Sequence, residues 1–167
     1  RGPKGSVVRL EIIPATNAPN DQTSKVVHIT REAVKLEDQA ASKSIIKLNQ
    51  DGHDYSLGVI TIPAFYLDFK AYREGNPDYK STTRDVKRLL GELQAAKVDG
   101  VVLDLRDNGG GSLQEATDLT GLFIDQGPTV LVRNSDGRVD VLSDEDQGVY
   151  YSGPLAVLVN RLSASAS

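Results

Sequence analysis

The sequence contains no cysteine, methionine or tryptophan, and only two of its 167 residues are histidine. The absence of cysteine excludes disulfides, thiolate catalysis and zinc–thiolate sites, but it is compatible with any redox compartment. No apolar run approaches the roughly 18 residues that a membrane-spanning helix needs. A formal net charge of −4 gives no electrostatic reason to expect a nucleic-acid partner.

The composition that is present is typical of a globular protein. Hydrophobic residues make up 39% of the chain and charged residues 25%, and the length suffices for one core of ordinary size. Because the chain lacks an initiator methionine and begins and ends within motifs, we expect it to be a piece of a longer protein. Missing targeting signals therefore say little about that protein.

Two strand-like runs rich in β-branched residues open the chain, at residues 5–14 and 25–36. A polar loop after Pro14 separates them, and they could pair as a hairpin. A stretch of about 35 residues with so few apolar positions cannot bury an independent core. We therefore expect this first part to be the remnant of a domain.

The pattern from Asp38 onward predicts an α/β domain built from layered βα units. Residues 44–63 contain two strand runs around the turn signal Asp51-Gly52, and a helix is predicted to follow, with Ser81 or Thr82 as its N-cap. The apolar face of this helix has the i, i+3, i+4, i+7 spacing and consists of Val86, Leu89, Leu90 and Leu93.

The rest of the chain alternates between predicted strands and helices. Strands buried on both faces are predicted at residues 100–105 and 154–160, where the sequence is almost continuously apolar. Between them, the sequence predicts a helix at 113–123 and a hairpin formed by residues 129–133 and 138–142.

Three consecutive glycines, Gly109 to Gly111, directly follow a predicted buried strand and precede a predicted helix. This arrangement supplies backbone freedom, uncovered N–H groups and a helix N-terminus, which together suit a negatively charged group. The loop has neither the Lys-Ser/Thr ending of a P-loop nor the G-x-G-x-x-G spacing, so phosphate is disfavoured. The remaining alternatives are an oxyanion formed during acyl transfer and a tight turn without a ligand.

The stretch "LSASAS" places three serines where a strand ends at Asn160 and a helix is expected to begin near Ser165. A serine there can act as a nucleophile, because the helix dipole and free amides favour a developing negative charge. An N-cap is the commoner role of such a serine. Acyl-transfer sites combine two such groups: a hydroxyl that serves as the nucleophile and a backbone amide that stabilises the oxyanion. Here one βα turn would supply the hydroxyl and another, lined by glycines, the amide.

The sequence offers no clear candidate for the general base that would activate such a serine. His28 lies on a strand of the first part and His53 lies beside a turn, where surface or loop roles are favoured over catalysis. A desolvated lysine can also activate a serine, but no lysine lies in a run apolar enough to suggest burial. If a lysine is the base, it lies beyond Ser167.

Residues 100–124 ("GVVLDLRDNGGGSLQEATDLTGLFI"), followed by "GPLAVLVNRLSASAS", closely resemble the carboxyl-terminal processing peptidases, in particular the tail-specific proteases of Gram-negative bacteria. In the pattern of that family the middle serine is the nucleophile, which corresponds to Ser165. The amide that follows it, on Ala166, forms the oxyanion hole together with one amide from the glycine loop, on Gly110 or Gly111.

The resemblance implies a serine endopeptidase with a Ser–Lys dyad, which cleaves unfolded or C-terminally tagged proteins through an acyl-enzyme and uses no cofactor or metal. The lysine follows the serine by roughly 25 residues in these enzymes, so this chain by itself is expected to be inactive. Residues 1–37 are expected to be the last strands of a PDZ domain. Residues 38–167 are expected to be the first part of a protease core with the ClpP/crotonase-like spiral of βα units, here incomplete.

The resemblance further implies a periplasmic protein that binds polypeptide substrates at their C-termini, with no nucleic-acid partner and with any adaptor protein unknown. Two other functions stay open. A crotonase-type acyl-CoA enzyme shares the glycine-loop oxyanion hole but lacks a serine nucleophile. A non-catalytic peptide-binding scaffold would use the βα layers only to support a PDZ domain.

Overall fold

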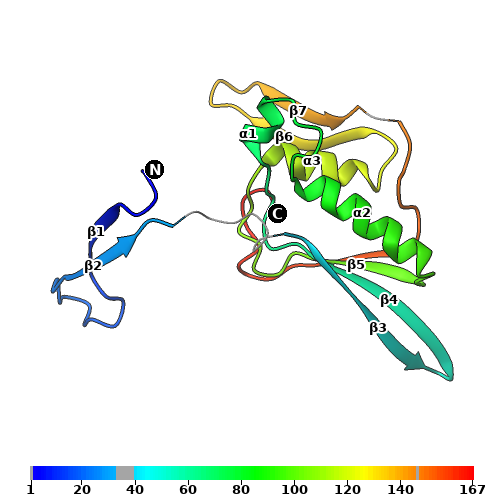
Figure 1. Ribbon diagram of the computed structural model, residues 1–167, viewed down its shortest axis with the longest axis horizontal. Helices are drawn as coiled ribbons and strands as arrows, with labels where there is room; N and C mark the ends of the chain where they lie inside the picture. Colours follow the sequence, from blue (N-terminus) through cyan, green and yellow to red (C-terminus); the bar gives the residue numbers. More distant parts are fainter. Residues whose placement is uncertain (1, 33–39, 146) are drawn as a thin grey trace. The chain divides into compact units, whose positions relative to one another are not determined.

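The structure is a computed structural model that describes residues 2–32, 40–145 and 147–167 (Figure 1). The chain divides into two compact units, Arg1–Lys35 and Leu36–Ser167. The domain boundary predicted between residues 37 and 38 lies outside the described residues. Both the glycine loop and the serine stretch belong to the second unit.

The first unit contains a two-stranded antiparallel hairpin. Its strands β1 (Val7–Ile12) and β2 (Lys25–Thr30) pair so that Val7 lies opposite Thr30. The predicted pairing is confirmed, although the second strand ends at Thr30, and residues 33–36 of the predicted run lie outside the described residues. The side chains of both strands are mostly exposed, because two strands alone offer too little apolar surface to enclose a core.

A four-stranded mixed sheet forms the centre of the second unit, with the strand order β3-β4-β5-β8. Its strands are β3 (Ser42–Gln50), β4 (His53–Thr61), β5 (Gly100–Asp104) and β8 (Leu155–Leu158). β3 and β4 pair antiparallel around Asp51 and Gly52, which both have positive φ angles (53° and 80°), so this predicted turn is confirmed. β4, β5 and β8 run parallel, and the loops that follow them therefore emerge at one edge of the sheet.

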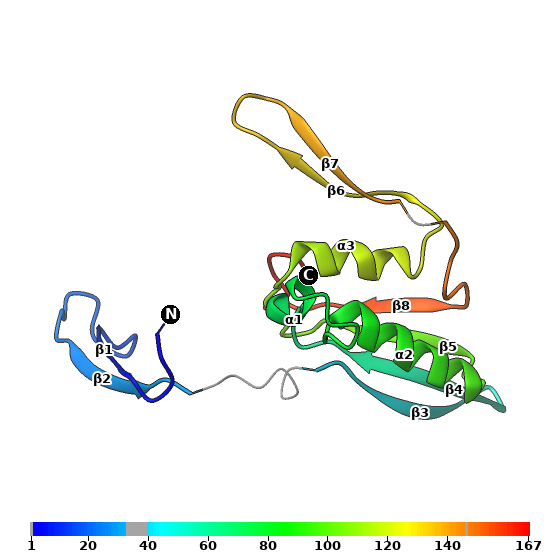
Figure 2. The same ribbon diagram turned by 45° about the horizontal axis from the view of Figure 1, so that its top comes forward.

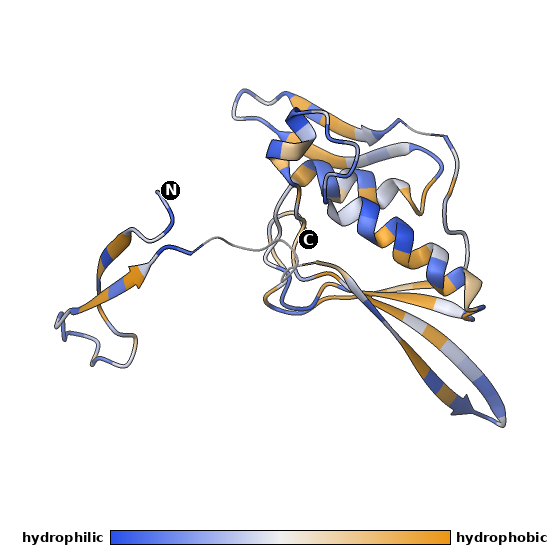
Figure 3. Cartoon of the chain, in the orientation of Figure 1, coloured by the Kyte–Doolittle hydropathy of each residue, from blue (hydrophilic) through white to orange (hydrophobic). Residues whose placement is uncertain are grey.

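Helices α2 (Thr82–Ala95) and α3 (Leu113–Gly121) lie over one face of this sheet (Figure 2). The predicted cap of α2 is confirmed, because the Ser81 hydroxyl accepts the Arg84 N–H at 3.3 Å. The amphipathic pattern of α2 is visible as alternating hydrophilic and hydrophobic segments in Figure 3. Its predicted apolar face is buried and forms the core with side chains from the sheet: Val86, Leu89, Leu90, Leu93, Ile60, Ile62 and Leu103.

A second hairpin, formed by β6 (Gly127–Arg133) and β7 (Val139–Asp144), follows α3 as predicted, with Gly137 at a φ of 87° in its turn. Helix α1 (Phe69–Arg73) was not predicted from the sequence. This helix is short, and it begins where the Asp68 carboxylate accepts two backbone N–H groups.

One expectation about the last segment of the chain is wrong. The sequence predicts that β8 is buried on both faces, but all four of its residues are exposed, because β8 is the edge strand and pairs only with β5 within the described residues. Around Ser165 the chain forms a turn, in which the Ser167 N–H donates to the Ala164 carbonyl at 3.2 Å. Two residues follow Ser165 in this sequence, fewer than one helical turn, so the helix expected to begin there stays a prediction.

Candidate active site

The candidate site lies beyond the carboxyl ends of β5 and β8, where the glycine loop follows one strand and the serine stretch follows the other (Figure 2). Because these strands are parallel neighbours, the two segments emerge side by side. This edge is where open α/β sheets usually bind their ligands.

An ion pair fixes the first residues after β5. Asp104, which is buried at the end of the strand, accepts hydrogen bonds from Arg106 on both carboxylate oxygens, from Nε at 2.9 Å and from Nη2 at 2.7 Å. The Arg106 backbone N–H donates to the same carboxylate at 3.1 Å. The bonds to Arg106 lower the pKa of the Asp104 carboxyl below its ordinary value.

Two of the three glycines occupy positions that only glycine suits. The φ angles of Gly110 and Gly111 are 95° and 143°, a region that residues with a Cβ rarely adopt. Phe65 holds this part of the loop, because its N–H donates to the Gly110 carbonyl (2.9 Å) and its carbonyl accepts the Ser112 N–H (2.8 Å). A Cβ on Gly111 would collide with the Phe65 carbonyl, whereas Gly109 has open space around its Cβ position.

Hydrogen bonds tie the serine stretch to the glycine loop. The Asn160 Nδ2 donates to the Asp107 carboxylate at 2.8 Å, and the Asp107 N–H donates in return to the Asn160 Oδ1 at 3.0 Å. Further along, the Ala164 N–H donates to the Asn108 carbonyl at 3.0 Å. The segment from Asn160 to Ala164 is therefore hydrogen-bonded at both of its ends to the residues that precede the three glycines.

Ser165 and Ala166 lie directly against Gly110. A Cβ built on Gly110 would lie only 2.6 Å from the Ser165 Cβ and 2.9 Å from the Ala166 nitrogen. The structure therefore places the site residues named from the sequence next to one another, while their roles stay predictions.

The three serines of the stretch differ in their hydrogen bonds. The Ser163 hydroxyl donates to the Leu105 carbonyl at 2.8 Å and accepts a backbone N–H at 2.9 Å, and the Ser167 hydroxyl donates to the Asn108 carbonyl at 3.2 Å. Ser165 is exposed, and its hydroxyl has no hydrogen-bond partner within the described ranges. Its φ of 62° is rare for a residue with a side chain and costs about 1–2 kcal/mol.

The backbone N–H groups of the site also differ in whether they have a hydrogen-bond acceptor. The Gly110 N–H donates to the Asn108 Oδ1 at 2.7 Å. The N–H groups of Gly111 and Ala166 meet no acceptor in the part of the chain that the structure describes. Of the three amides named from the sequence, these two can therefore donate to an incoming oxygen without breaking an existing bond.

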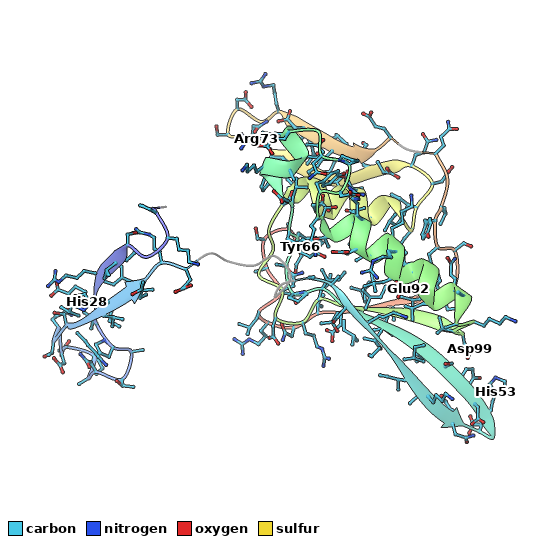
Figure 4. All side chains as sticks on the ribbon, in the orientation of Figure 1. His28, His53, Tyr66, Arg73, Glu92 and Asp99 are labelled. Carbon is cyan, nitrogen blue, oxygen red and sulfur yellow. The ribbon has the colours of Figure 1, made fainter. Side chains whose placement is uncertain are left out.

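Within the second unit, His53 lies away from Ser165, because His53 is at the start of β4 whereas Ser165 follows the carboxyl end of β8, which runs parallel to β4 in the same sheet. His28 is on β2, in the first unit, and His53 lies at the tip of the β3–β4 hairpin, where it contacts the Tyr55 ring (Figure 4). Across residues 2–32, 40–145 and 147–167, no lysine is hydrogen-bonded to the Ser165 hydroxyl. The same residues contain no cluster of three or more histidine, cysteine, aspartate or glutamate side chains that could bind a metal.

Two buried polar residues near the site were not predicted from the sequence. One is Asn108, which accepts the Gly110 N–H, and the other is Glu115, whose carboxylate accepts the Thr83 N–H at the start of α2 (2.8 Å). The spacing Ser112-x-x-Glu115 signals a capping box, in which Glu115 would accept the Ser112 N–H. That N–H already donates to a loop carbonyl, so the carboxylate reaches α2 instead.

Comparisons with known proteins give consistent results. Residues 56–167 match peptidase family S41. The chain is 41% identical to the tail-specific protease of Haemophilus influenzae, over all of this chain and 21% of that protein, and 32% identical to the carboxyl-terminal-processing protease of Synechocystis sp., over all of this chain and 34% of that protein. The solved structure of the photosystem II D1 C-terminal processing protease matches with a TM-score of 0.63 at 25% identity, over 99% of this chain and 40% of that one.

The fold and the site define a mixed α/β protein in which the turn that contains Ser165, here called the serine turn (residues 163–167), lies against the glycine loop. The chain belongs to peptidase family S41, and the resemblance to carboxyl-terminal processing peptidases is confirmed. It spans between a fifth and about a third of the length of these two relatives. No helix in the described residues is long and apolar enough to cross a membrane.

Proposed function

We propose that this chain supplies the nucleophile and the oxyanion donors of a serine endopeptidase. The observation that carries the proposal is the difference among three serines of one short stretch. Ser163 and Ser167 donate their hydroxyls to backbone carbonyls, whereas Ser165 presents an unengaged hydroxyl on a strained turn beside the glycine loop. A nucleophile held on such a turn, next to free backbone N–H groups, suits acyl transfer.

In the proposed reaction the Ser165 oxygen attacks the carbonyl carbon of a peptide bond, and its proton passes to a base. The base then gives this proton to the nitrogen of the peptide bond, the C–N bond breaks, and the amine leaves as an acyl-enzyme forms. The N–H groups of Gly111 and Ala166 stabilise the negative charge that develops on the carbonyl oxygen. The engagement of the Gly110 N–H by Asn108 favours Gly111 over Gly110 as the donor from the loop. Water then hydrolyses the acyl-enzyme.

We propose that the base is a lysine in a longer protein of which this chain is a part. Two observations support this: the chain spans only 21% of the Haemophilus influenzae relative, and no lysine among the described residues is hydrogen-bonded to the Ser165 hydroxyl. On the same resemblance, residues 1–37 would end a PDZ domain, and residues 38–167 would begin a ClpP/crotonase-like spiral. The substrates would be unfolded or tagged polypeptides bound at their C-termini in the periplasm, without a metal or cofactor.

A fluorophosphonate probe on the full-length protein that contains this chain tests the nucleophile. We expect covalent labelling of the wild-type protein, with the label located on Ser165 by mass spectrometry. Ser165→Ala should abolish labelling, whereas Ser163→Ala and Ser167→Ala, the matched controls from the same stretch, should retain it. A label on Ser163 or Ser167 refutes the assignment. Absence of any label favours the crotonase-type acyl-CoA enzyme or the peptide-binding scaffold.

A further inference from the structure

We propose that Asn108 is a positioning residue that holds the glycine loop in register with the serine turn. This inference rests on the proposed function and deepens it, because Asn108 touches no reacting group and acts through Gly110. Its side chain is completely buried, so a direct contact with a polypeptide substrate is excluded.

Asn108 makes hydrogen bonds to three separate segments. Its Nδ2 donates to the Ile62 carbonyl at 2.9 Å, just after β4, and its Oδ1 accepts the Gly110 N–H at 2.7 Å. Its backbone carbonyl accepts both the Ala164 N–H (3.0 Å) and the Ser167 hydroxyl (3.2 Å). The end of β4, the glycine loop and the serine turn are thus all fixed to one residue.

The bond from Gly110 sets the orientation of the loop. With its N–H held by Asn108 and its carbonyl held by the Phe65 N–H, Gly110 is fixed on both sides at a φ of 95°. The next amide, on Gly111, is left without an acceptor and is the proposed oxyanion donor. Glycine has no side chain to restrict its backbone, so a Gly110 released from Asn108 can rotate and carry the Gly111 N–H with it.

The same contacts also stabilise the fold, because removal of the carboxamide leaves the buried Gly110 N–H without its partner. A loss of activity alone therefore does not separate positioning from stability. To separate the two roles, turnover has to be measured per correctly folded site. A second variant also has to remove one hydrogen bond while it keeps the Asn108 side chain.

The first test compares Asn108→Ala with the wild type in the full-length protein, with kcat calculated per site titrated by the fluorophosphonate probe. We expect kcat to fall on the order of 100-fold with KM nearly unchanged, the usual effect of a reacting group displaced by about 1 Å. The matched control is Asn49→Ala, on exposed β3, where the lost side chain bonds Asp54 in the neighbouring strand and no other described residue. This control should leave kcat unchanged.

The second test replaces the Gly110 amide with an ester, by incorporating glycolic acid, so that only the N–H is lost. We expect a fall in kcat similar to that of Asn108→Ala, and little further loss when the two changes are combined. Hydrogen exchange at the Gly110 amide should be slow in the wild type and at least about tenfold faster in Asn108→Ala. A wild-type kcat in the ester variant, or additive losses in the combined variant, overturns the positioning role.

The outcomes also separate this inference from the proposed function. If the wild-type protein is not labelled at Ser165, the proposed function fails and the positioning role fails with it. If Ser165 is labelled but Asn108→Ala and the ester variant turn over like the wild type, only the positioning role is overturned.

Discussion

Alanine substitution of the three adjacent loop glycines should have three different effects. The Cβ of Gly109→Ala enters open space at an ordinary φ, so this variant should resemble the wild type. The Cβ of Gly111→Ala meets the Phe65 backbone, which is part of the folded framework, so this variant should lose stability. The Cβ of Gly110→Ala meets Ser165, so this variant should lose turnover.

The expected loss of turnover in Gly110→Ala can be estimated from two distances. Carbon atoms in favourable contact are about 3.5–4.0 Å apart, and the new Cβ would lie 2.6 Å from the Ser165 Cβ, so one of the two must move by about 1 Å. A displacement of that size costs about 100-fold in rate, or about 2.7 kcal/mol of barrier. The positive φ adds about 1–2 kcal/mol of backbone strain to the cost of folding.

The assay measures kcat/KM per titrated site, together with thermal unfolding, for the three variants in the full-length protein. Gly109→Ala is the matched control, because it adds the same methyl group one residue away. If Gly110→Ala and Gly109→Ala are equally active, the contact between the glycine loop and Ser165 does not govern turnover, and the reasoning is refuted.

Three further substitutions test the framework of the site. Ser163→Ala removes a hydroxyl that donates to the Leu105 carbonyl and accepts the Asn160 N–H, and it should lower the free energy of unfolding by about 1–3 kcal/mol in urea titrations; an unchanged midpoint would contradict its structural role. Glu115→Ala leaves the Thr83 N–H without its acceptor and should cost a similar amount, measured in the same way. Arg106→Ala removes the partner that lowers the pKa of Asp104. The wild type should therefore have the higher Tm at pH 7, and this advantage should vanish as the pH falls below the ordinary Asp pKa of about 3.9; a difference independent of pH would disprove the linkage.

The elements predicted correctly from the sequence are those with local determinants. α2 was predictable because its cap and its apolar spacing lie within one stretch of sequence, and the same residues bury that face in the structure. The β3–β4 turn was predictable because Asp51-Gly52 accommodates the positive φ angles that a tight hairpin requires.

The details of the site depend on contacts between residues far apart in the sequence, and these were not predictable. In "SASAS" the three serines have nearly identical neighbours, so local sequence does not distinguish them. Their difference arises because Ser163 and Ser167 reach carbonyls 58 and 59 residues earlier in the chain. The exposure of β8 has a similar origin, since an apolar run reveals neither the position of its strand in the sheet nor what covers it.

The 167-residue chain by itself should show no measurable peptidase activity, even though Ser165 is exposed and lies beside two unengaged amides. A serine hydroxyl is a weak nucleophile until a base takes its proton, and the described residues place no histidine or lysine in hydrogen-bond contact with it. Residual catalysis from oxyanion donors alone falls orders of magnitude below that of a complete site. The measurement is incubation of the purified chain with an unfolded polypeptide that ends in small apolar residues, followed by mass spectrometry. Cleavage that Ser165→Ala abolishes would show that a base within residues 1–167 suffices, and the proposal of a lysine outside the chain would then be wrong.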